Sequence, residues 1–204
     1  MIVIGLTGAT GAGKGFFGKT AFEKYGIVHI DTDKTAREVV MPGEPCLEDI
    51  KDFFGEEVIN EDGTLNRKKL GEIVFSDKEK LSVLNRITHH YITDKVKKTI
   101  ENARSNNEKA VIIDAPLLFE SGEDKLCDVT VGVIAHRNIR KSRIMSRDGI
   151  SEEMAESRIA SGKDEGFFRE KCDYILENNG NEAEYTNKAI LVIEEILKIR
   201  LEKL

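Results

Sequence analysis

The feature that most constrains this chain is a glycine-rich stretch near its start, GATGAGKG at residues 8–15. A short apolar run, 2–7, precedes it, and residues 14–25 suit a helix that Gly26 would end. A strand, a glycine-rich turn and a helix in this order form a phosphate-binding loop. Its backbone N–H groups point inward and the helix N-terminus attracts anions. The sequence therefore predicts an ATP site in which Lys14 reaches the outer phosphates.

The loop departs from the usual pattern G-x-x-x-x-G-K-[ST] at Gly15, which stands where a hydroxyl normally binds Mg²⁺. The next residue, Phe16, cannot supply that hydroxyl either. The Gly-Lys-Gly segment resembles the loop of adenylate kinases, in which the metal is held largely through water, although threonine usually follows there. We therefore expect Mg²⁺ to be held by ATP, by water molecules and by carboxylates from elsewhere in the chain. The glycine order also differs from the dinucleotide fingerprint G-x-G-x-x-G.

Short β-branched runs alternate with helical patterns along the rest of the chain. The expected strands are 2–7, 27–30, 110–113, 129–134 and 174–176, and the expected helices are 14–25, 47–54, 67–75, 78–103 and 181–204. This alternation predicts a parallel β-sheet covered by helices on both faces. We expect a core formed by 1–33, 105–137 and 172–204, with a helical insertion at 34–104 and a second insertion at 138–171.

Composition limits the classes of function. The chain has 204 residues, of which 40% are hydrophobic and 33% charged, which suits one globular domain with insertions. A net charge of -6 argues against a general nucleic-acid binder. The first apolar run is too short for a signal peptide or a membrane span, so no membrane partner is expected. Cys46, Cys127 and Cys172 lack metal-ligand spacing, which predicts reduced thiols in a cytoplasmic protein.

Three aspartates follow predicted strands, and ligands bind at the carboxyl ends of strands in open α/β sheets. Asp31 and Asp33 are expected on the same side of an extended chain, where one of them can take a proton from an acceptor hydroxyl. Alternatively, an aspartate here caps a helix in the stretch after Asp33. Asp114 is the second acidic element expected in a phosphate-loop enzyme, where it can hold the water shell of the metal.

Motifs spread over nearly the whole chain resemble the dephospho-CoA kinase family. They are GLTGATGAGK at 5–14, IDTDKTAR at 30–37, PG at 42–43, FG at 54–55, DGTLNRKKL at 62–70, VF at 74–75, LNRITH at 84–89, DAPLLFE at 114–120, RIMSRD at 143–148 and DYILENNG at 173–180. The phosphate loop alone is generic, whereas D-x-D-x-x-A-R followed by P-L-L-x-E is much more specific. The resemblance implies an α/β phosphate-loop kinase: a parallel β-sheet core flanked by helices, with a helical CoA-binding insertion and a lid.

The resemblance also implies an activity and its residues. The family transfers the γ-phosphoryl group of ATP, with Mg²⁺, to the ribose 3′-hydroxyl of dephospho-CoA, giving CoA and ADP in the last step of coenzyme A biosynthesis. The implied catalytic residues are Lys14, Asp33 as the base, and Arg143. The implied ATP-binding residues are Gly8, Gly11, Ala12, Gly13, Lys14, Gly15, Phe16 and the lid arginines Arg143 and Arg147. The implied substrate-binding residues are Thr7, Asp31, Asp33, Arg37, His89, Pro116 and Leu117, and Asp114 is the residue that holds the metal through water.

Arg143 and Arg147 belong to a basic run, 136–148, that interrupts an otherwise acidic chain. Guanidinium groups suit the charge that phosphoryl transfer spreads over phosphate oxygens, and a closed lid excludes water. The remaining basic residues of the run, Arg137, Arg140 and Lys141, are expected on a solvated helix face.

Three positions depart from the family pattern, and they keep alternatives open. The family loop usually continues Ser-Thr where this chain has Gly15 and Phe16, a His-Pro pair stands where this chain has two histidines at 89–90, and a glutamine stands at Gly162. The Gly-Lys-Gly loop slightly favours another small-molecule kinase of this fold, such as a nucleoside monophosphate kinase. The departures also allow a nucleotide- or CoA-binding protein without catalysis. However, the charged residues of the expected site are all present, namely Lys14, Asp33, Asp114, Arg143 and Arg147.

Overall fold

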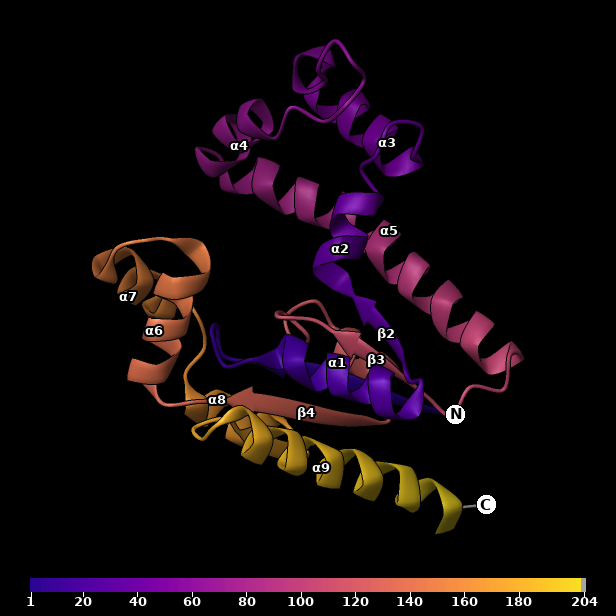
Figure 1. The fold of residues 1–204 in the computed structure, drawn as a ribbon. Coiled ribbons are helices and arrows are strands. Elements are labelled where there is room, and N and C mark those ends of the chain that lie inside the picture. The colour runs from indigo at the N-terminus through magenta and orange to yellow at the C-terminus, as the bar shows by residue number, and fades with distance from the viewer. Residues whose placement is uncertain (203–204) are drawn as a thin grey trace. The chain divides into compact units, whose positions relative to one another are not determined.

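The computed structural model describes residues 1–202, with side chains through residue 198, and is built on a five-stranded parallel β-sheet (Figure 1). The strands are β1 Ile2–Gly8, β2 Val28–Asp31, β3 Ala110–Asp114, β4 Val129–Ile134 and β5 Tyr174–Glu177. Their order in the sheet is β2-β3-β1-β4-β5. Each of the five predicted strands is confirmed to within one residue at either end. Because β1 is central, the loop that follows it emerges from the middle of the carboxyl edge, where ligands bind in such sheets.

Helices connect the strands. They are α1 Lys14–Tyr25, α2 Thr32–Glu38, α3 Pro45–Phe54, α4 Arg67–Phe75, α5 Lys78–Ser105, α6 Arg137–Asp148, α7 Glu152–Ala160, α8 Glu165–Lys171 and α9 Glu182–Glu202, with 3₁₀ turns η1 Glu56–Val58 and η2 Glu123–Leu126. All the predicted helices are present. Residues 203 and 204 of the predicted last helix lie outside the described residues.

The chain after β2 corrects one expectation. The sequence predicted extended backbone through Asp31 and Asp33, which is wrong, because helix α2 begins at Thr32. The side chain of Asp31 accepts a hydrogen bond of 3.0 Å from the backbone N–H of Lys34 and so caps the helix. The alternative that an aspartate caps a helix here is therefore correct, but the capping residue is Asp31 and the helix starts before Asp33, not after it. Asp33 lies in the first turn, where the helix dipole favours a negative charge.

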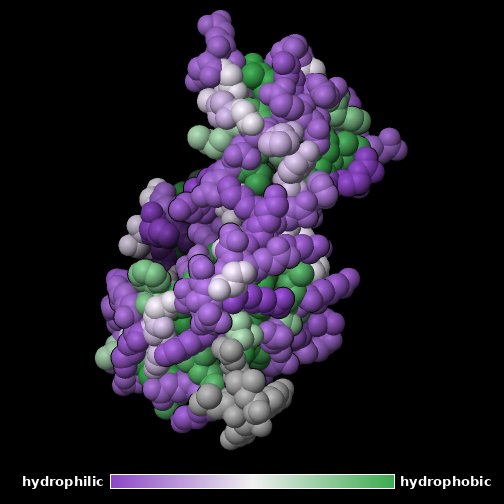
Figure 2. Space-filling view, turned by 90° about the vertical axis from the view of Figure 1, so that its right-hand side faces the viewer, coloured by the Kyte–Doolittle hydropathy of each residue, from purple (hydrophilic) through white to green (hydrophobic). Residues whose placement is uncertain are grey.

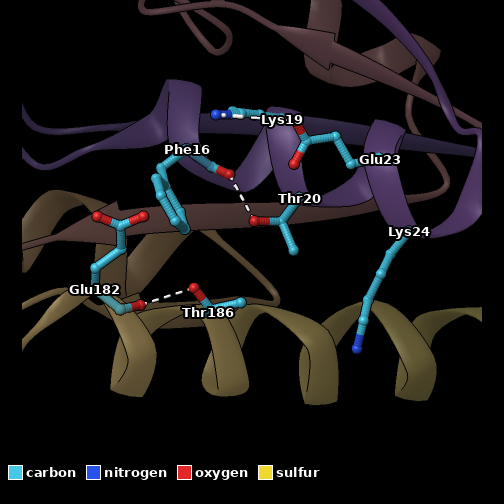
Figure 3. A pocket seen from close by; sticks show the side chains of 7 residues that line it. All are labelled: Phe16, Lys19, Thr20, Glu23, Lys24, Glu182 and Thr186. Carbon is cyan, nitrogen blue, oxygen red and sulfur yellow. Dashed lines mark hydrogen bonds and ion pairs between the residues drawn. The ribbon is translucent and has the colours of Figure 1, made fainter.

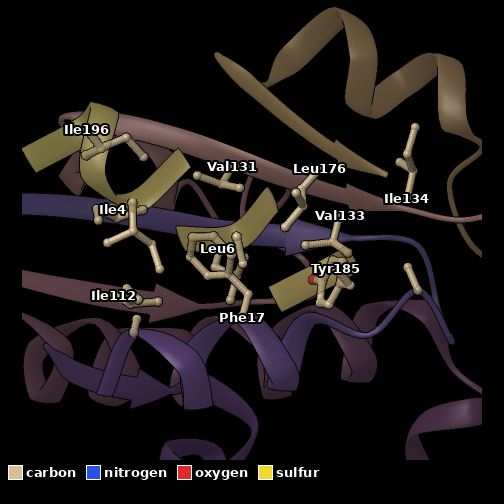
Figure 4. Packing of buried hydrophobic residues seen from close by; sticks show 14 of the residues in the cluster. Ile4, Leu6, Phe17, Ile112, Val131, Val133, Ile134, Leu176, Tyr185 and Ile196 are labelled. Carbon is tan, nitrogen blue, oxygen red and sulfur yellow. The ribbon is translucent and has the colours of Figure 1, made fainter. Parts of the chain in front are cut away.

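Helices α1 and α9 cover one face of the sheet (Figures 1 and 4). Figure 4 shows the side chains that meet there, among them Ile4, Leu6, Ile112, Val131, Val133 and Leu176 from the strands, Phe17 from α1, and Tyr185 and Ile196 from α9. These side chains are at most 2% exposed. Burying each large apolar side chain contributes roughly 1.5–3 kcal/mol. This packing fixes the start of α1 and therefore the loop that precedes it.

On the opposite face, thiols pack against two strand glycines. A Cβ added at Gly5 would lie 2.8 Å from Sγ of Cys127, and one added at Gly132 would lie 2.8 Å from Sγ of Cys172. Burial raises the pKa of each of these two thiols to about 12, and both are free. They therefore serve as small packing groups. Within residues 1–202, no cluster of three or more His, Cys, Asp or Glu side chains could hold a metal ion.

The chain divides into two compact units, which are described separately. The first unit contains residues 1–30 and those from 102 onward, and it carries the sheet. The second contains Asp31–Glu101. Its helices enclose a separate apolar core formed by Val39, Val40, Cys46, Ile50, Phe54, Val58, Leu70 and Val74. In this second unit the hydroxyl of Tyr91 on α5 donates a 2.6 Å hydrogen bond to Asp49 of α3, which ties the two helices together.

Figure 2 shows one face of the molecule, on which hydrophilic side chains cover most of the surface and apolar ones form separate patches. Large apolar side chains that are well exposed include Phe22, Phe53, Phe75 and Leu191. None of the helices in the described part of the chain is long and apolar enough to cross a membrane.

Candidate active site

The phosphate loop connects the end of β1 to the start of α1. At Gly8 the neighbouring strand comes so close that an added Cβ would lie 2.1 Å from the carbonyl oxygen of Val133, so only glycine fits. The backbone N–H of Ala9 donates to that same oxygen at 3.0 Å. Gly13 caps α1 with φ at 100°, a left-handed conformation that costs other residues free energy. The loop residues thus have the backbone that an anion cradle needs.

Side chains from distant segments hold the carbonyl oxygens of this loop. The oxygen of Ala12 accepts hydrogen bonds from Nδ2 of Asn178 at 2.8 Å and from Nη1 of Arg143 at 3.3 Å. The oxygen of Gly13 accepts one from the hydroxyl of Tyr185 at 3.3 Å. Burial raises the pKa of this tyrosine well above its usual value, so the hydroxyl stays protonated and remains a donor.

Lys14 opens helix α1, and its ammonium group reaches back over the loop. Nζ donates a 3.1 Å hydrogen bond to the carbonyl oxygen of Gly8. A positive charge therefore lies against the glycine-rich backbone, at the N-terminus of a helix whose dipole has the same sign. This arrangement is suited to a polyphosphate.

The two departures in the loop have different structural consequences. Gly15 is exposed, and a Cβ added there would meet nothing within 4 Å. Phe16 instead turns its ring toward α9, where it packs against Tyr185 with ring centroids 5.6 Å apart. The position that usually carries a second hydroxyl is thus used for packing between two helices, whereas the first is open and could accept a larger side chain.

Figure 3 shows the groove beside this ring, between α1 and α9. Its other lining residues are Lys19, Thr20, Glu23 and Lys24 of α1, and Glu182 and Thr186 of α9. The two threonine hydroxyls donate to carbonyl oxygens of their own helices, those of Phe16 and Glu182. Its volume of about 300 Å³ is at the lower limit for small-molecule sites. Since its threonine hydroxyls are already used within the helices, we assign the groove no ligand.

Asp114 ends β3 and pairs in register with Leu6 of β1, just before the phosphate loop. Nε2 of His29, from β2, lies 3.4 Å from Oδ2 of the aspartate. Gly18 of α1 makes room for the imidazole, because an added Cβ would lie 2.8 Å from the ring. The aspartate side chain is 14% exposed, so a carboxylate oxygen remains within reach of solvent. No sequence pattern indicated the contact between His29 and Asp114.

The segment predicted as a lid forms three helices, α6 to α8. Arg143 of α6 points to the phosphate loop, as described above, whereas Arg147 pairs with Asp148. Asp148 also pairs with Arg158 of α7. Hydrogen bonds from Arg147 lower the pKa of this aspartate and raise that of the arginine. The structure therefore brings Arg143, but not Arg147, to the loop.

Arg140 contradicts its predicted place on a solvated face, because it is only 6% exposed. Its Nε donates to the carbonyl oxygen of Ala135 at 2.9 Å, and burial lowers its pKa. Its own carbonyl oxygen would lie 2.9 Å from a Cβ at Gly11. The first turns of α6 are thus packed directly against the phosphate loop. Arg137, by contrast, is exposed and pairs with Glu156.

The predicted acceptor residues of the first unit lie at the end of β1 and in the segment after β3. Thr7 is 1% exposed, and its hydroxyl donates to the carbonyl oxygen of Pro116 at 3.4 Å. Leu117 is 59% exposed. Farther along, Glu120 forms an ion pair of 3.4 Å with Lys163 between α7 and α8. Thr7 therefore supports the turn from inside, while Pro116 and Leu117 face solvent.

The second unit carries the remaining predicted residues. Asp33 and Arg37 lie one turn apart on α2, at positions i and i+4, and both are exposed. His89 is exposed on α5. Asp31, also exposed, is engaged as the cap of α2.

Sequence reasoning missed three residues of this region: His29, Asn178 and Tyr185. Asn178 lies within the motif DYILENNG at 173–180, but the sequence analysis assigned it no role. Tyr185 lies on the apolar face of α9 and was not distinguished from core residues. The hydrogen bond from Asn178 to Ala12 spans 166 positions, so no local pattern reveals it.

Comparison with known proteins identifies relatives over almost the whole chain. The family profile described as dephospho-CoA kinase matches residues 2–184. A dephospho-CoA kinase of Listeria innocua is 40% identical over 192 residues, covering 94% of this chain and 95% of that protein. One of Saccharomyces cerevisiae is 37% identical over 205 residues, covering 98% and 85%. A solved structure of the dephospho-CoA kinase from Campylobacter jejuni is similar with a TM-score of 0.72 at 29% identity, covering 97% of this chain and 98% of that one.

Proposed function

This chain belongs to the dephospho-CoA kinase family, and we propose that it transfers the γ-phosphoryl group of ATP to the ribose 3′-hydroxyl of dephospho-CoA, giving CoA and ADP. The observation that carries the proposal is the phosphate loop, with Lys14 folded over it and Arg143 bound to its backbone. Together with the family match, these groups make the chain a kinase that uses a nucleotide donor and a small-molecule hydroxyl acceptor. The cytoplasm, where both substrates are available, is its proposed location, with no nucleic acid among its partners.

The donor ATP is proposed to bind along residues 8–16. The backbone N–H groups of the loop hold the phosphates, and Lys14 neutralises the outer ones. Arg143, already at the loop, and Arg147, after release from Asp148, are proposed to meet the equatorial oxygens of the transferred group. We assign residues 138–171 as the lid that excludes water, so that ATP is not hydrolysed.

Mg²⁺ is proposed as the metal of the reaction. Its usual hydroxyl ligand is replaced by Gly15, but Asp114 presents a carboxylate at the strand end beside the loop, and oxygen is the donor that this ion prefers. The residues present therefore fit a magnesium ion held by ATP, water and Asp114. The ion would neutralise charge on the β- and γ-phosphates during transfer.

The acceptor is proposed to bind residues of the insertion 34–104 and of the turn after β3. Asp33 takes the proton of the 3′-hydroxyl as its oxygen forms a bond to the γ-phosphorus, and the bond from that phosphorus to the bridging oxygen of ADP breaks. Arg37, one helical turn from Asp33, is proposed to hold an acidic group of the acceptor. His89, Asp31, Pro116 and Leu117 complete the proposed contacts, with Thr7 behind the turn.

The test is ADP release from ATP and Mg²⁺ by the full chain, with and without dephospho-CoA. We expect release that depends on dephospho-CoA and exceeds that with AMP as acceptor. Asp33→Asn should lower kcat by about 10²- to 10⁴-fold, the range for loss of a general base. Asp52→Asn, which removes an exposed aspartate of α3, is the matched control and should keep full activity. Equal rates with AMP, or no turnover while ATP still binds, would contradict the proposal.

A further inference from the structure

Asn178 follows β5 and is 7% exposed, which makes it one of the few buried polar side chains of the described residues. Its backbone N–H donates to the carbonyl oxygen of Ile134 at 2.9 Å, which extends the pairing of β5 with β4. The backbone at this position is therefore fixed by the sheet. The side chain projects from this fixed point to the phosphate loop.

Both ends of the Asn178 amide are used. Nδ2 donates to the carbonyl oxygen of Ala12, and Oδ1 accepts from Nη2 of Arg143 at 3.1 Å. A carbonyl oxygen cannot donate and a guanidinium cannot accept, so only this orientation of the amide satisfies both partners. A carboxylate would keep the contact with Arg143 but would face the oxygen of Ala12 without a proton between them. The position therefore requires an amide and not merely a polar group.

Trans peptide geometry transmits this contact to the N–H groups of the loop. The carbonyl of Ala12 and the N–H of Gly13 belong to one planar peptide and point in opposite directions. Holding the oxygen of Ala12 on one side therefore directs the N–H of Gly13 to the other. In the same way, the hydrogen bond from Tyr185 to the oxygen of Gly13 directs the N–H of Lys14.

Asn178 and Tyr185, with their hydrogen bonds to the loop carbonyls, form what we call the brace. The space around these two side chains is tight. A Cβ at Gly13 would lie 2.4 Å from Nδ2 of Asn178, so the amide fills the volume beneath the loop. Tyr185 is 2% exposed, and its ring packs against that of Phe16. This packing holds the tyrosine hydroxyl at the carbonyl oxygen of Gly13. The loop peptides thus have one supported orientation before any nucleotide arrives.

We propose that Asn178 and Tyr185 are positioning residues for ATP, which orient the Gly13 and Lys14 N–H groups as phosphate donors, with Asn178 also aligning Arg143. Neither residue touches the phosphates; each acts through the loop backbone or the guanidinium. The inference rests on the proposed function, because it takes the loop and Arg143 as the donor site.

ADP binding to the full chain, measured by calorimetry in Mg²⁺, tests the brace without requiring turnover. Asn178→Asp should weaken ADP binding at least about tenfold, since it removes the donor to Ala12 and adds a charge facing a carbonyl oxygen. It should also lower kcat and raise the KM for ATP, while the KM for dephospho-CoA stays within about twofold of wild type. Tyr185→Phe removes only the hydroxyl and should weaken ADP binding by about three- to tenfold.

Asn179→Asp is the matched control, because Asn179 is the adjacent residue and its Oδ1 accepts from the backbone N–H of His136 at 2.8 Å. A carboxylate retains that acceptor, so ADP binding should be unchanged. ADP affinity in Asn178→Asp equal to wild type would overturn the proposal, as would lost activity with unchanged affinity. If Asn178→Asp does not fold, unchanged ADP affinity in Tyr185→Phe has the same meaning. ADP binding without turnover of dephospho-CoA would contradict only the proposed function.

Discussion

The phosphate loop and the proposed lid, residues 138–171, both carry groups proposed to bind phosphate, but their arginines and carbonyls are held by different kinds of contact. The loop carbonyls are bonded to Asn178 and Tyr185, which are 7% and 2% exposed. In the lid, Arg147 and Arg158 share Asp148 with guanidinium groups that are 64% and 47% exposed. Exposed ion pairs of this kind contribute about 0–1 kcal/mol, whereas a buried polar group left without its partner costs about 1–3 kcal/mol. The loop is therefore preorganised, whereas Arg147 and Arg158 can exchange their partner at little cost.

Helix α6 carries both kinds of contact, buried ones to the phosphate loop and exposed ion pairs. Ile144 is fully buried, and its side chain would lie 2.9 Å from a Cβ at Gly11 of the loop. Arg143, one residue earlier, is bonded to the loop, whereas Arg147, one turn later, is exposed. The N-terminal part of the helix thus belongs to the rigid site.

The largest expected effect is in the loop. Lys14→Ala removes the ammonium group that donates a hydrogen bond to the carbonyl oxygen of Gly8. It also removes the charge that is proposed to stabilise the transferred phosphoryl group. We expect kcat to fall by about 10³-fold, the loss typical of one strong electrostatic contact to a transition state. Steady-state kinetics with dephospho-CoA measures it. Lys19→Ala, which removes an exposed lysine of the same helix, is the control and should change kcat less than about twofold.

A pair of glycine substitutions, one in the phosphate loop and one in the proposed lid, compares the two regions directly. Gly13→Ala introduces a Cβ at positive φ and 2.4 Å from Nδ2 of Asn178, so the loop peptide must shift. The left-handed backbone alone costs about 1–2 kcal/mol, and ADP affinity should fall by about 10²-fold.

Gly162→Ala, in the lid, meets only ordinary contacts of 3.7 Å or more and has no left-handed backbone. Its unfolding free energy should stay within about 0.5 kcal/mol of wild type, as for other surface changes. Chemical denaturation and calorimetry with ADP measure both variants. Similar losses of ADP affinity and of unfolding free energy in Gly13→Ala and Gly162→Ala would mean that the proposed lid is as rigidly held as the loop.

Gly15→Ser should have a smaller effect, and in the opposite direction. The position is exposed and an added Cβ meets nothing within 4 Å, so serine fits without strain. Its hydroxyl would stand where phosphate-loop enzymes bind Mg²⁺ directly. We expect the Mg²⁺ concentration for half-maximal rate to fall by about three- to tenfold, since one metal ligand is restored. An unchanged Mg²⁺ dependence, together with a wild type that needs no divalent ion, would contradict the proposed metal arrangement.

The sequence predicted those parts of the fold that local patterns determine. The strands and helix α1 follow from apolar runs, glycines and the spacing of one motif. Helix α2 was missed because Asp31 and Asp33 were interpreted for their chemistry, although an aspartate followed by helix-compatible residues is also a cap signal. That local signal was present and could have been used.

The brace and the burial of Arg140 could not be predicted in this way. Asn178 reaches Ala12 across 166 positions and Arg143 across 35, so the contacts depend on strand order and on the packing of α6. A basic run of this composition is usually solvated, and only the close approach of α6 to Gly11 buries one arginine from it. Tertiary packing, rather than local propensity, decided both features.

The smallest expected effect concerns the lid pair. The pKa of Asp148 is lowered by its hydrogen bonds from Arg147 and by the charge of Arg158. Because the folded-state pKa lies below the ordinary value of 3.8, the pair stabilises the fold fully above that pH. The contribution is lost as the pH falls through the lowered pKa.

Asp148→Asn should therefore lower the melting temperature at about pH 7 by at most about 2 °C, and the difference from wild type should be smaller at a pH below 3.8 than at about pH 7. Added salt at about 0.5 M should reduce the difference at neutral pH, because both arginines are exposed and screened. Calorimetric scans at the two pH values measure it. A difference that persists in acid and in salt would show that Asp148 supports the lid by packing rather than by charge, and the lid would then resemble the loop more than its contacts indicate.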